Sequence, residues 1–508
     1  MNRVSIFSLL VAITLLYVSC DSTKANKQNL VPSGLTGEQL SQQHCVSCHA
    51  YPSPNLVEKE WWAKGILPKM ALRLGMGNKM GYLTNISYED MMEVSVANIY
   101  PDAPAMAPED WKKIVDFYVK NAPEKPIPQV SKVKATQLSD LFDIQTLENT
   151  NNEPSLVTMV KILPNEQALY VAHRGRNRVE KWDKTLQKIS EVPTESPVSD
   201  VVKTPNNMMA LGMGIMDPND QALGKLWNIS KSTPQTLVEK LRRPVEISMG
   251  DLDANGAPDY LICEFGNDIG KLTWYDQNFK LKKEILNFAG IRNATITDIN
   301  GDKLPDIVVL QTQGDEGIWV LENRGNGEFE PKRVLRFPPI YGSSFIQVVD
   351  INKDGYQDIV YTNGDNADAS ISLKRYHGVH VYLNDGKMNF KRQYFYPMHG
   401  ASKALSQDFD GDGDMDIAAI SFFPDKKQSP AEGFLYFENT GKGFTPHFME
   451  GISDKKWMVM DCGDLDKDGD IDLVLGAFNL QDRDRQSNAS SEKRTGVYVL
   501  KSKNKTHL

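Results

Sequence analysis

The chain has 508 residues, a formal net charge of −9, 40% hydrophobic residues and 24% charged residues. This length exceeds what one small core supports, so two or more domains are expected. The internal sequence holds no apolar run near the roughly 20 residues of a membrane helix. It also holds no basic stripe with interleaved aromatic residues, which argues against nucleic acid as a partner.

The first 19 residues have the pattern of an export signal. Arg3 precedes an apolar stretch over 4–18, which Ser19 and Cys20 follow, and this order is typical of secretion rather than of a spanning helix. The position of Cys20 resembles the cleavage and acylation site of bacterial lipoproteins, with Tyr17 in place of the usual leucine. We expect an exported lipoprotein, held at the outer membrane only by lipid on Cys20 and facing the periplasm or the cell surface. Secretion with a free Cys20 is the alternative.

Residues 20–34 predict a polar tether, and 35–122 predict a small all-α domain. Within 109–122, apolar side chains recur at helical spacing, and Pro108 stands where a helix tolerates proline. An earlier helix is predicted in the stretch "TGEQLSQQHCVSCH". Residues 123–135, rich in proline at their start, predict a linker.

The C-x-x-C-H motif of Cys45, Cys48 and His49 ends that earlier helix. A zinc site would need four ligands, and the segment lacks a second Cys/His pair. A thioredoxin-like thiol pair would need a βαβ setting, which is also missing. C-x-x-C-H is the attachment signature of c-type haem, with thioether bonds at both thiols and the histidine on the iron. The region resembles the cytochrome c domain, which implies one covalently bound haem c and electron transfer with a redox partner protein.

Methionine is a common second axial ligand of haem iron in cytochromes c. The stretch "WWAKGILPKMALRLG" resembles cytochrome domains that are fused to propellers, which implies Met70 as this ligand. Met106 in "PAMAPEDW" is the alternative, because small cytochromes often place the ligand on the loop before the last helix.

Residues 136–505 change to short apolar runs separated by turns rich in Gly, Asn and Asp. Four short strands in each unit of roughly 50 residues are typical of propeller blades. Residues 150–240 keep strand pairs, enough for two blades, but lack an acidic template that recurs later in the chain. The template stands at 251–259, 298–306, 350–358, 408–416 and 464–472, each followed by a strand-like run.

Oxygen ligands at positions one, three, five and nine of the template converge in a tight turn, which suits Ca²⁺. Glycine at position six permits the turn, with Lys303 in its place in the second copy. Up to five Ca²⁺ ions are expected, and an Asp/Gly-rich hairpin without metal is the alternative. The expected ligands are Asp251, Asp253, Asn255, Asp259, Asp298, Asn300, Asp302, Asp306, Asp350, Asn352, Asp354, Asp358, Asp408, Asp410, Asp412, Asp416, Asp464, Asp466, Asp468 and Asp472.

The template and its spacing resemble the FG-GAP/VCBS repeat, whose family forms seven-bladed β-propellers. The resemblance implies a multidomain fold in which a small all-α cytochrome c domain precedes an all-β propeller. We expect seven blades, with six or eight as alternatives. The stretches "GDNAD" and "LKRYHG" resemble bacterial proteins that fuse the two domains, and this resemblance implies no established reaction.

If the acidic loops join the first two strands of each blade, the remaining long loops share the opposite face. Loops on a rigid scaffold are frequent binding sites, so a polar pocket there would offer His377, His399, Asp368 and Lys374 as candidate catalytic groups. Hydrogen bonding between blades is the alternative role of these loops. We therefore expect an electron-transfer protein whose propeller is a docking or ligand-binding module. The alternatives are a haem-linked dehydrogenase for a sugar or alcohol, and a carbohydrate- or protein-binding module with a haem sensor.

Overall fold

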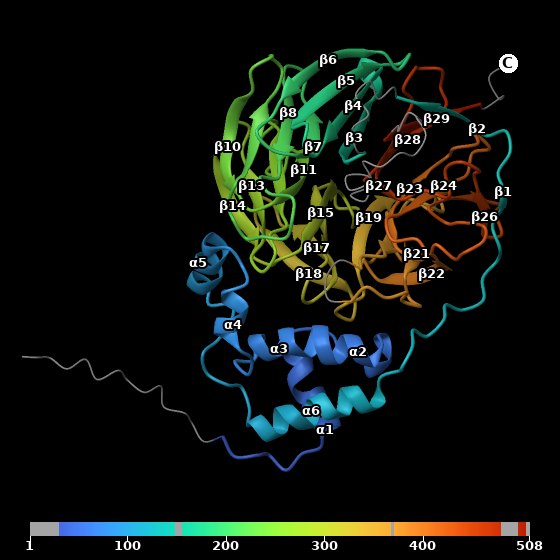
Figure 1. The fold of residues 1–508 in the computed structure, drawn as a ribbon. Coiled ribbons are helices and arrows are strands. Elements are labelled where there is room, and N and C mark those ends of the chain that lie inside the picture. The colour runs from blue at the N-terminus through green and yellow to red at the C-terminus, as the bar shows by residue number, and fades with distance from the viewer. Residues whose placement is uncertain (1–29, 148–154, 367–369, 479–495, 504–508) are drawn as a thin grey trace, which may run out of the picture.

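The computed structural model describes residues 30–147, 155–366, 370–478 and 496–503. Its α-helices lie between Gly37 and Asn121, and its strands lie between Thr136 and Ser502. Figure 1 shows the helices grouped to one side of a ring of sheets, below the ring in this view, with the linker running along the outside of the ring. None of the helices in the described ranges combines the length and apolarity that crossing a membrane requires. The predicted export signal and Cys20 lie outside the described residues.

The helical domain packs around its first and last helices. Thr36 caps α1 (Gly37–His44) in a reciprocal capping box with Gln39, which satisfies N–H groups that the start of a helix leaves unpaired. α6 (Pro108–Asn121) begins at proline, and its Ile114 and Tyr118 are fully buried in one cluster with Leu40. Both predicted helices therefore form. The other segments are η1 (Cys45–Ser47), η2 (Pro54–Leu56), α2 (Lys59–Trp61), η3 (Trp62–Ile66), α3 (Leu67–Arg73), α4 (Lys79–Leu83) and α5 (Tyr88–Val96).

Seven sheets built on four antiparallel strands each form the propeller, which confirms the expected seven blades. From the ring centre outward, blade 1 holds β3 (Val157–Leu163), β4 (Ala168–His173), β5 (Arg178–Asp183) and β6 (Lys188–Pro193), with η4 (Pro164–Glu166) after β3. Blade 2 holds β7 (Val198–Lys203), β8 (Met208–Gly212), β9 (Gly224–Asn228) and β10 (Gln235–Leu241). Blade 3 holds β11 (Pro244–Gly250), β12 (Asp259–Glu264), β13 (Lys271–Tyr275) and β14 (Leu281–Leu286).

The later blades repeat this order. Blade 4 holds β15 (Ile291–Thr297), β16 (Asp306–Gln311), β17 (Gly317–Asn323) and β18 (Phe329–Arg336), and blade 5 holds β19 (Ser343–Val349), β20 (Asp358–Asn363), β21 (Gly378–Asn384) and β22 (Phe390–Pro397). Blade 6 holds β23 (Ala401–Gln407), β24 (Asp416–Ser421), β25 (Phe434–Asn439) and β26 (Phe444–Phe448), and β1 (Thr136–Gln137) adds a parallel strand to β26. Blade 7 holds β27 (Trp457–Gly463), β28 (Asp472–Ala477), β29 (Val497–Ser502) and β2 (Phe142–Thr146).

The two ends of the propeller chain meet in blade 7. β2 precedes blade 1 in the sequence and pairs antiparallel with β29, with Phe142 opposite Ser502 and Thr146 opposite Tyr498. The innermost strands pack against one another around the ring, and β27 of the last blade packs against β3 of the first. The ring is therefore closed by backbone hydrogen bonds between its first and last strands.

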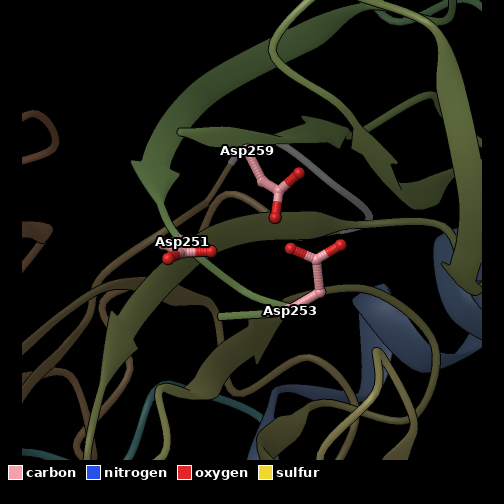
Figure 2. A group of neighbouring side chains, drawn as sticks. All are labelled: Asp251, Asp253 and Asp259. Carbon is pink, nitrogen blue, oxygen red and sulfur yellow. The ribbon is translucent and has the colours of Figure 1, made fainter. Parts of the chain in front are cut away.

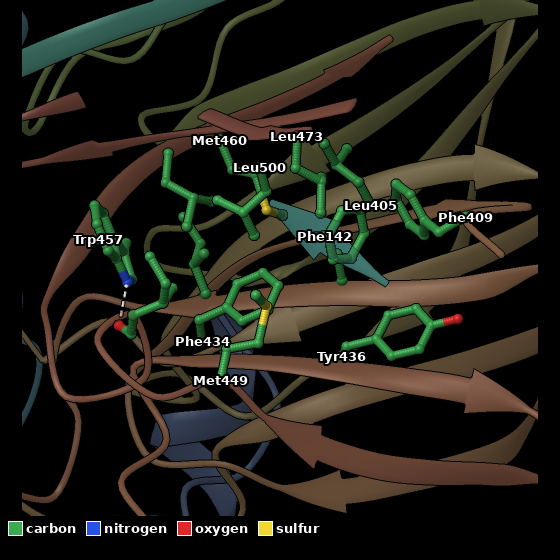
Figure 3. Packing of buried hydrophobic residues seen from close by; sticks show 14 residues of the cluster. Phe142, Leu405, Phe409, Phe434, Tyr436, Met449, Trp457, Met460, Leu473 and Leu500 are labelled. Carbon is green, nitrogen blue, oxygen red and sulfur yellow. Dashed lines mark hydrogen bonds between the residues drawn. The ribbon is translucent and has the colours of Figure 1, made fainter. Parts of the chain in front are cut away.

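The closing strand also contributes to the core. Figure 3 shows Phe142 of β2 packed with Phe409, Met460 and Leu500 in the cluster between blades 6 and 7. Trp457 lies in the same cluster, fully buried, and its indole N–H donates to Ile452 O at 3.0 Å. Burial of this kind is the main stabilising contribution in a propeller, because each blade is covered by its two neighbours.

Side chains of the innermost strands bond to the backbone of the next blade. Asp461 accepts the N–H of Ile162 at 2.8 Å, and Glu246 accepts that of Ala294 at 2.9 Å. The innermost strand of a sheet has unpaired N–H groups along its free edge, so these bonds satisfy that edge and join adjacent blades. In the same way, the side-chain oxygens of Asp200, Asn293 and Gln347 accept the backbone N–H groups of Ile247, Ile346 and Ser406, respectively.

Candidate functional site

Five acidic loops join the first and second strands of blades 3 to 7. In blade 3, Asp251 and Asp253 lie in the loop after β11, and Asp259 begins β12. Figure 2 shows these three carboxylates gathered around one point. Oxygen atoms this close together are the ligands that Ca²⁺ prefers. Carboxylate oxygens lie within 4.8 Å of one another in four groups: Asp251, Asp253 and Asp259; Asp298, Asp302 and Asp306; Asp408, Asp410 and Asp416; and Asp464, Asp466 and Asp468.

The first aspartate of each loop holds the turn in shape. In blade 5, Asp350 accepts the N–H groups of Asp354 at 3.1 Å and of Gly355 at 2.8 Å. Position six is left-handed, and Lys303 adopts this conformation with φ of 69° where the other loops have glycine. The residue at position four also has a left-handed backbone conformation. The sequence template did not predict this, because a different mix of residue types occupies that position in the five loops. The residues there are Ala254, Gly301, Lys353, Gly411 and Lys467.

The ninth-position aspartates of blades 4 to 6 lie where a negative charge is unfavourable. Burial, followed by repulsion from neighbouring carboxylates, raises the pKa of Asp306 and of Asp358 to about 6 and that of Asp416 to about 7. For Asp306 the repelling neighbours are Asp302 and Asp298. Because carboxylates held this close repel one another, a cation at their centre is electrostatically favoured.

The C-x-x-C-H motif lies at the carboxyl end of α1. Cys45 begins the turn η1 and is half-buried against the helical core, whereas Cys48 is exposed. The His49 ring is largely buried, and its Nδ1 is hydrogen-bonded to Ala50 O at 2.9 Å. Burial is the main cause that lowers the pKa of His49, so the imidazole is neutral near pH 7. The hydrogen bond occupies Nδ1, which leaves Nε2 as the ring nitrogen for a metal.

The two methionines that the sequence favours as axial ligands pack in the same cluster as Cys45. Met70 lies in α3 and is half-buried, and Met106 lies just before α6 and is buried. The structure therefore brings both candidates to one side of the helical domain, together with the motif.

The helical domain contacts the propeller through loops on the face opposite to the acidic loops. Arg73 of α3 forms an ion pair with Asp268, which lies between β12 and β13. Glu93 of α5 pairs with Arg242 at 2.8 Å, between β10 and β11. Both propeller loops belong to the face that the sequence assigned to ligand binding. Part of this face is therefore covered by the chain's own helices.

A second contact region lies at blades 4 and 5. Ser372, in the long loop between β20 and β21, donates to Glu58 at 2.7 Å. Ile340, between β18 and β19, packs against the helical core cluster that contains Cys45. The two contact regions together hold the helical domain across four neighbouring blades.

Charged side chains of blade 4 influence the pKa of His49. The Asp315 carboxylate raises the pKa of His49 and the Arg336 guanidinium lowers it, after the larger effect of burial. Asp315 accepts hydrogen bonds from Arg336 at 2.8 Å and from Arg333. These bonds outweigh the effect of burial and hold the pKa of Asp315 below its usual value. The propeller thus presents a compact arginine–aspartate cluster to the motif.

Three of the four candidate catalytic residues, Lys374, His377 and His399, lie in described loops of blades 5 and 6. His377 is fully buried, and neither ring nitrogen has a hydrogen-bond partner among the described residues. Burial, followed by the charge of Lys374, lowers the pKa of His377 well below its usual value. Burial lowers the pKa of His399 to about 4, and the two imidazoles lie close enough to influence each other. Lys374 is buried and donates to Asp365 O at 3.4 Å, and Asp368 lies outside the described residues.

Comparison with known proteins identifies the repeats. Residues 298–361 and 408–475 match the FG-GAP-like repeat, and these two segments contain the acidic loops of blades 4 to 7. The propeller therefore carries FG-GAP repeats.

Two curated relatives match parts of the chain. A T-cell immunomodulatory protein homolog of Plasmodium falciparum (isolate 3D7) is 28% identical over 181 residues, 33% of this chain and 24% of the relative. Integrin alpha-PS5 of Drosophila melanogaster is 34% identical over 137 residues, 24% of this chain and 14% of the relative. The chain thus spans about a quarter and about a seventh of the length of these relatives.

Solved structures that match the chain include the N-terminal domain of Nup159, with a TM-score of 0.42, 10% identity, and coverage of 74% of this chain and 99% of that one. BBS1N in complex with ARL6DN is similar at a TM-score of 0.44 and 10% identity, with coverage of 73% and 99%.

Proposed function

We propose that this chain is an electron-transfer protein that carries one haem c on its helical domain and uses a calcium-binding propeller as a docking or ligand-binding module. The observation that carries the proposal is the geometry of the C-x-x-C-H motif. His49 is neutral and its Nδ1 is fixed by Ala50 O, which is the arrangement of a histidine prepared to bind a metal through Nε2.

The residues around the motif would hold a covalently bound haem. Cys45 and Cys48 would form the thioether bonds, and His49 would ligate the iron, with Met70 as the second axial ligand and Met106 as the alternative. The haem, when bound, supplies reversible one-electron chemistry. The protein's own residues exclude water from one side of the site, because Tyr118 and Trp62 fill the core behind Cys45. A zinc or thiol–disulfide role has no such support in this helical setting.

Calcium binding is the second part of the proposal. Four acidic loops, those of blades 4 to 7, lie in segments that match the FG-GAP-like repeat, and the loops of blades 3, 4, 6 and 7 each bring three carboxylates within 4.8 Å of one another. Calcium would cross-link each loop to the ninth-position aspartate at the start of the following strand. Because a ligand that binds only the folded state stabilises it, the ions would brace the propeller.

The propeller would bind a protein or a small ligand through the loops that the helices leave uncovered. The relative named as an integrin alpha chain supports a binding role. The redox partner of the helical domain would be a separate protein. We also propose that the chain is exported and anchored through lipid on Cys20, because the charged and apolar segments before Cys20 have the order of an export signal.

A haem-linked dehydrogenase is the second candidate function. The observation that favours it is the fully buried His377 near the half-buried His399, because both ring nitrogens of His377 and Nδ1 of His399 have no hydrogen-bond partner among the described residues. Buried polar atoms normally find partners, so a polar occupant such as a sugar or alcohol hydroxyl would satisfy them. In this function the two imidazoles would serve as general bases.

The decisive experiment begins with expression in a host that attaches haem c. We expect one haem per chain that persists on a denaturing gel, is lost in the Cys45→Ala/Cys48→Ala variant and is retained in Cys263→Ala, a control that removes a propeller thiol. A wild-type chain without haem would contradict the proposal. The oxidised protein is then mixed anaerobically with sugars and alcohols. Reduction that disappears in His377→Ala would favour the dehydrogenase, whereas reduction only by redox proteins favours electron transfer.

A further inference from the structure

The acidic loop of blade 3 already contains a positive charge. Lys282, on the outer strand β14, reaches back to the loop, where its ammonium forms an ion pair with Asp253 and lies 3.7 Å from Asp259. Its ammonium also lies 4.3 Å from the centroid of the Trp274 ring, so a cation–π contact holds it in place. The lysine therefore occupies the region where the loop carboxylates converge.

The acidic loop of blade 7 has the same feature from a different strand. Lys501 of β29 donates to Asp466 at 2.8 Å and to Asp472 at 2.9 Å. Its side chain is only 11% exposed, so this ammonium is held among the carboxylates and is not a surface charge. An ammonium has three donors and no acceptor, and two of them are committed to template aspartates here.

The loops of blades 4, 5 and 6 are built without such a lysine in the described residues. Neutral groups contact their aspartates instead: Asn300 donates to Asp302, Asn352 donates to Asp354, and the Tyr436 hydroxyl donates to Asp416. Lys353 stands inside the blade 5 loop, but its ammonium bonds to Gly413 O of blade 6.

The strand register explains the difference between blade 7 and blades 4 and 6. Leu500 of β29 pairs with Leu473 of β28 in antiparallel register. The next residue, Lys501, therefore lies opposite Asp472, the ninth-position aspartate. At the same register position, blade 4 has Glu322 after Leu321 and blade 6 has Glu438 after Phe437. One position thus carries a positive charge in blade 7 and a negative charge in blades 4 and 6.

We infer that Lys282 and Lys501 are tethered cations that take the place of calcium in blades 3 and 7, so that the propeller binds Ca²⁺ in blades 4, 5 and 6 only. This inference rests on the proposed calcium binding and narrows it from five loops to three. Ca²⁺ needs six to eight oxygen ligands, and in blades 3 and 7 it would have to break the lysine contacts and remain beside the displaced ammonium. Like charges in one site repel, so these two loops keep their shape without metal.

The calcium stoichiometry of the whole protein tests the inference. Metal-free protein is equilibrated with Ca²⁺ by dialysis, and bound calcium is counted by atomic emission. We expect three ions per chain in the wild type, four in Lys282→Met, four in Lys501→Met and five in the double variant. Lys391→Met is the matched control, since Lys391 is an exposed lysine on the outer strand β22, and it should keep three.

A charge introduced at the register position in blade 4 tests the same idea in the opposite direction. Glu322→Lys should lower the count from three to two, and circular dichroism shows that each variant is folded. Five ions in the wild type, or unchanged counts in both lysine variants, would overturn the inference. No calcium in the wild type or in any variant would instead refute the proposed calcium binding on which the inference rests.

Discussion

Arg336 and Asp315 pair at 2.8 Å on blade 4 of the propeller, and the charges of both reach His49 in the helical domain. A motif near the start of the chain is thus placed within the electric field of residues nearly 300 positions later. This relationship makes the propeller part of the environment of the motif, so that residues of the propeller should tune a haem bound there.

Charge changes in this pair should shift the midpoint potential of a haem bound at the motif. Arg336→Ala removes a positive charge and should lower the potential, because a positive charge disfavours the oxidised iron. Asp315→Asn should raise it. One unit charge at an effective dielectric constant between about 20 and about 80 gives shifts on the order of tens of millivolts. Spectroelectrochemical titration measures them, with Arg324→Ala, an arginine on the acidic-loop side of the same blade, as the control. Equal potentials in all four proteins would show that blade 4 does not face the haem.

The ionic contacts between the domains should make docking sensitive to salt. Arg73→Ala and Arg242→Ala each remove one ion pair across the interface. Partly exposed pairs contribute only about 0.2–1 kcal/mol each, so the double variant should loosen the helical domain without unfolding it. Small-angle scattering should show a larger radius of gyration at high salt and in the double variant. Lys112→Ala removes an exposed pair within α6 and should change nothing, and a compact double variant would contradict this account of docking.

In the calcium-free protein, Asp306, Asp358 and Asp416 should contribute more stability at about pH 5.5 than at about pH 8, whereas buried histidines such as His377 and His399 act in the opposite direction below about pH 6.5. The pKa values of about 6 for Asp306 and Asp358 and about 7 for Asp416 exceed the roughly 3.9 of an aspartate in an unfolded chain. The folded state therefore binds protons more tightly, and this stabilisation is complete below the unfolded pKa and is lost as the pH rises through about 6 to 7.

Thermal unfolding at both pH values, with and without calcium, measures this effect. Calcium should raise the melting temperature more at the higher pH, because it then has no protons to displace. Asp416→Asn should reduce the pH dependence of the calcium-free protein. The same pH dependence in Asp416→Asn and in the wild type would contradict the raised pKa of Asp416.

Phe142→Ala should destabilise the propeller by about 3–5 kcal/mol, the usual cost of emptying a buried phenylalanine site. Phe142 fixes β2 in the cluster between blades 6 and 7, so the loss should appear as a lower denaturant midpoint. Ile144→Ala is the control, since Ile144 lies on the same strand but is 40% exposed, and it should cost less than about 1 kcal/mol. Similar losses in both variants would mean that β2 contributes mainly through its backbone.

The repeats made most of the fold predictable. The acidic template located the first loop and second strand of blades 3 to 7, because the turn requires aspartates and left-handed residues at fixed positions. Blades 1 and 2 were inferred from strand pairs alone, and they form as β3 to β6 and β7 to β10. The closing strands β1 and β2 had no local signal, since β1 has two residues and β2 finds its partner β29 at the other end of the propeller.

The candidate sites were predictable only as far as local motifs reach. Cys45, Cys48 and His49 form one local unit, and the aspartates of each acidic loop lie within nine residues. The contact between Arg73 and Asp268 joins two domains that are far apart in the sequence, so no local motif predicts it. Some of the loops that we expected to bind a ligand therefore form the interface with the helical domain instead. The contact between Lys501 and Asp466 was also not predicted from the sequence. An alignment of the blades would have indicated it, because lysine in blade 7 replaces the glutamate of blades 4 and 6 at the same register position.

The pairing of β2 with β29 sets an order of assembly. As the chain emerges from synthesis or from export, the helical domain has all of its own residues available first, whereas β2 must wait until the last strand has appeared. A truncation that removes 497–502 would leave six blades with both an open edge and an unpaired β2. Residues 497–502 therefore complete the ring last, and the proposed haem, if attached to the helical domain as soon as that domain has emerged, would be attached before the ring closes.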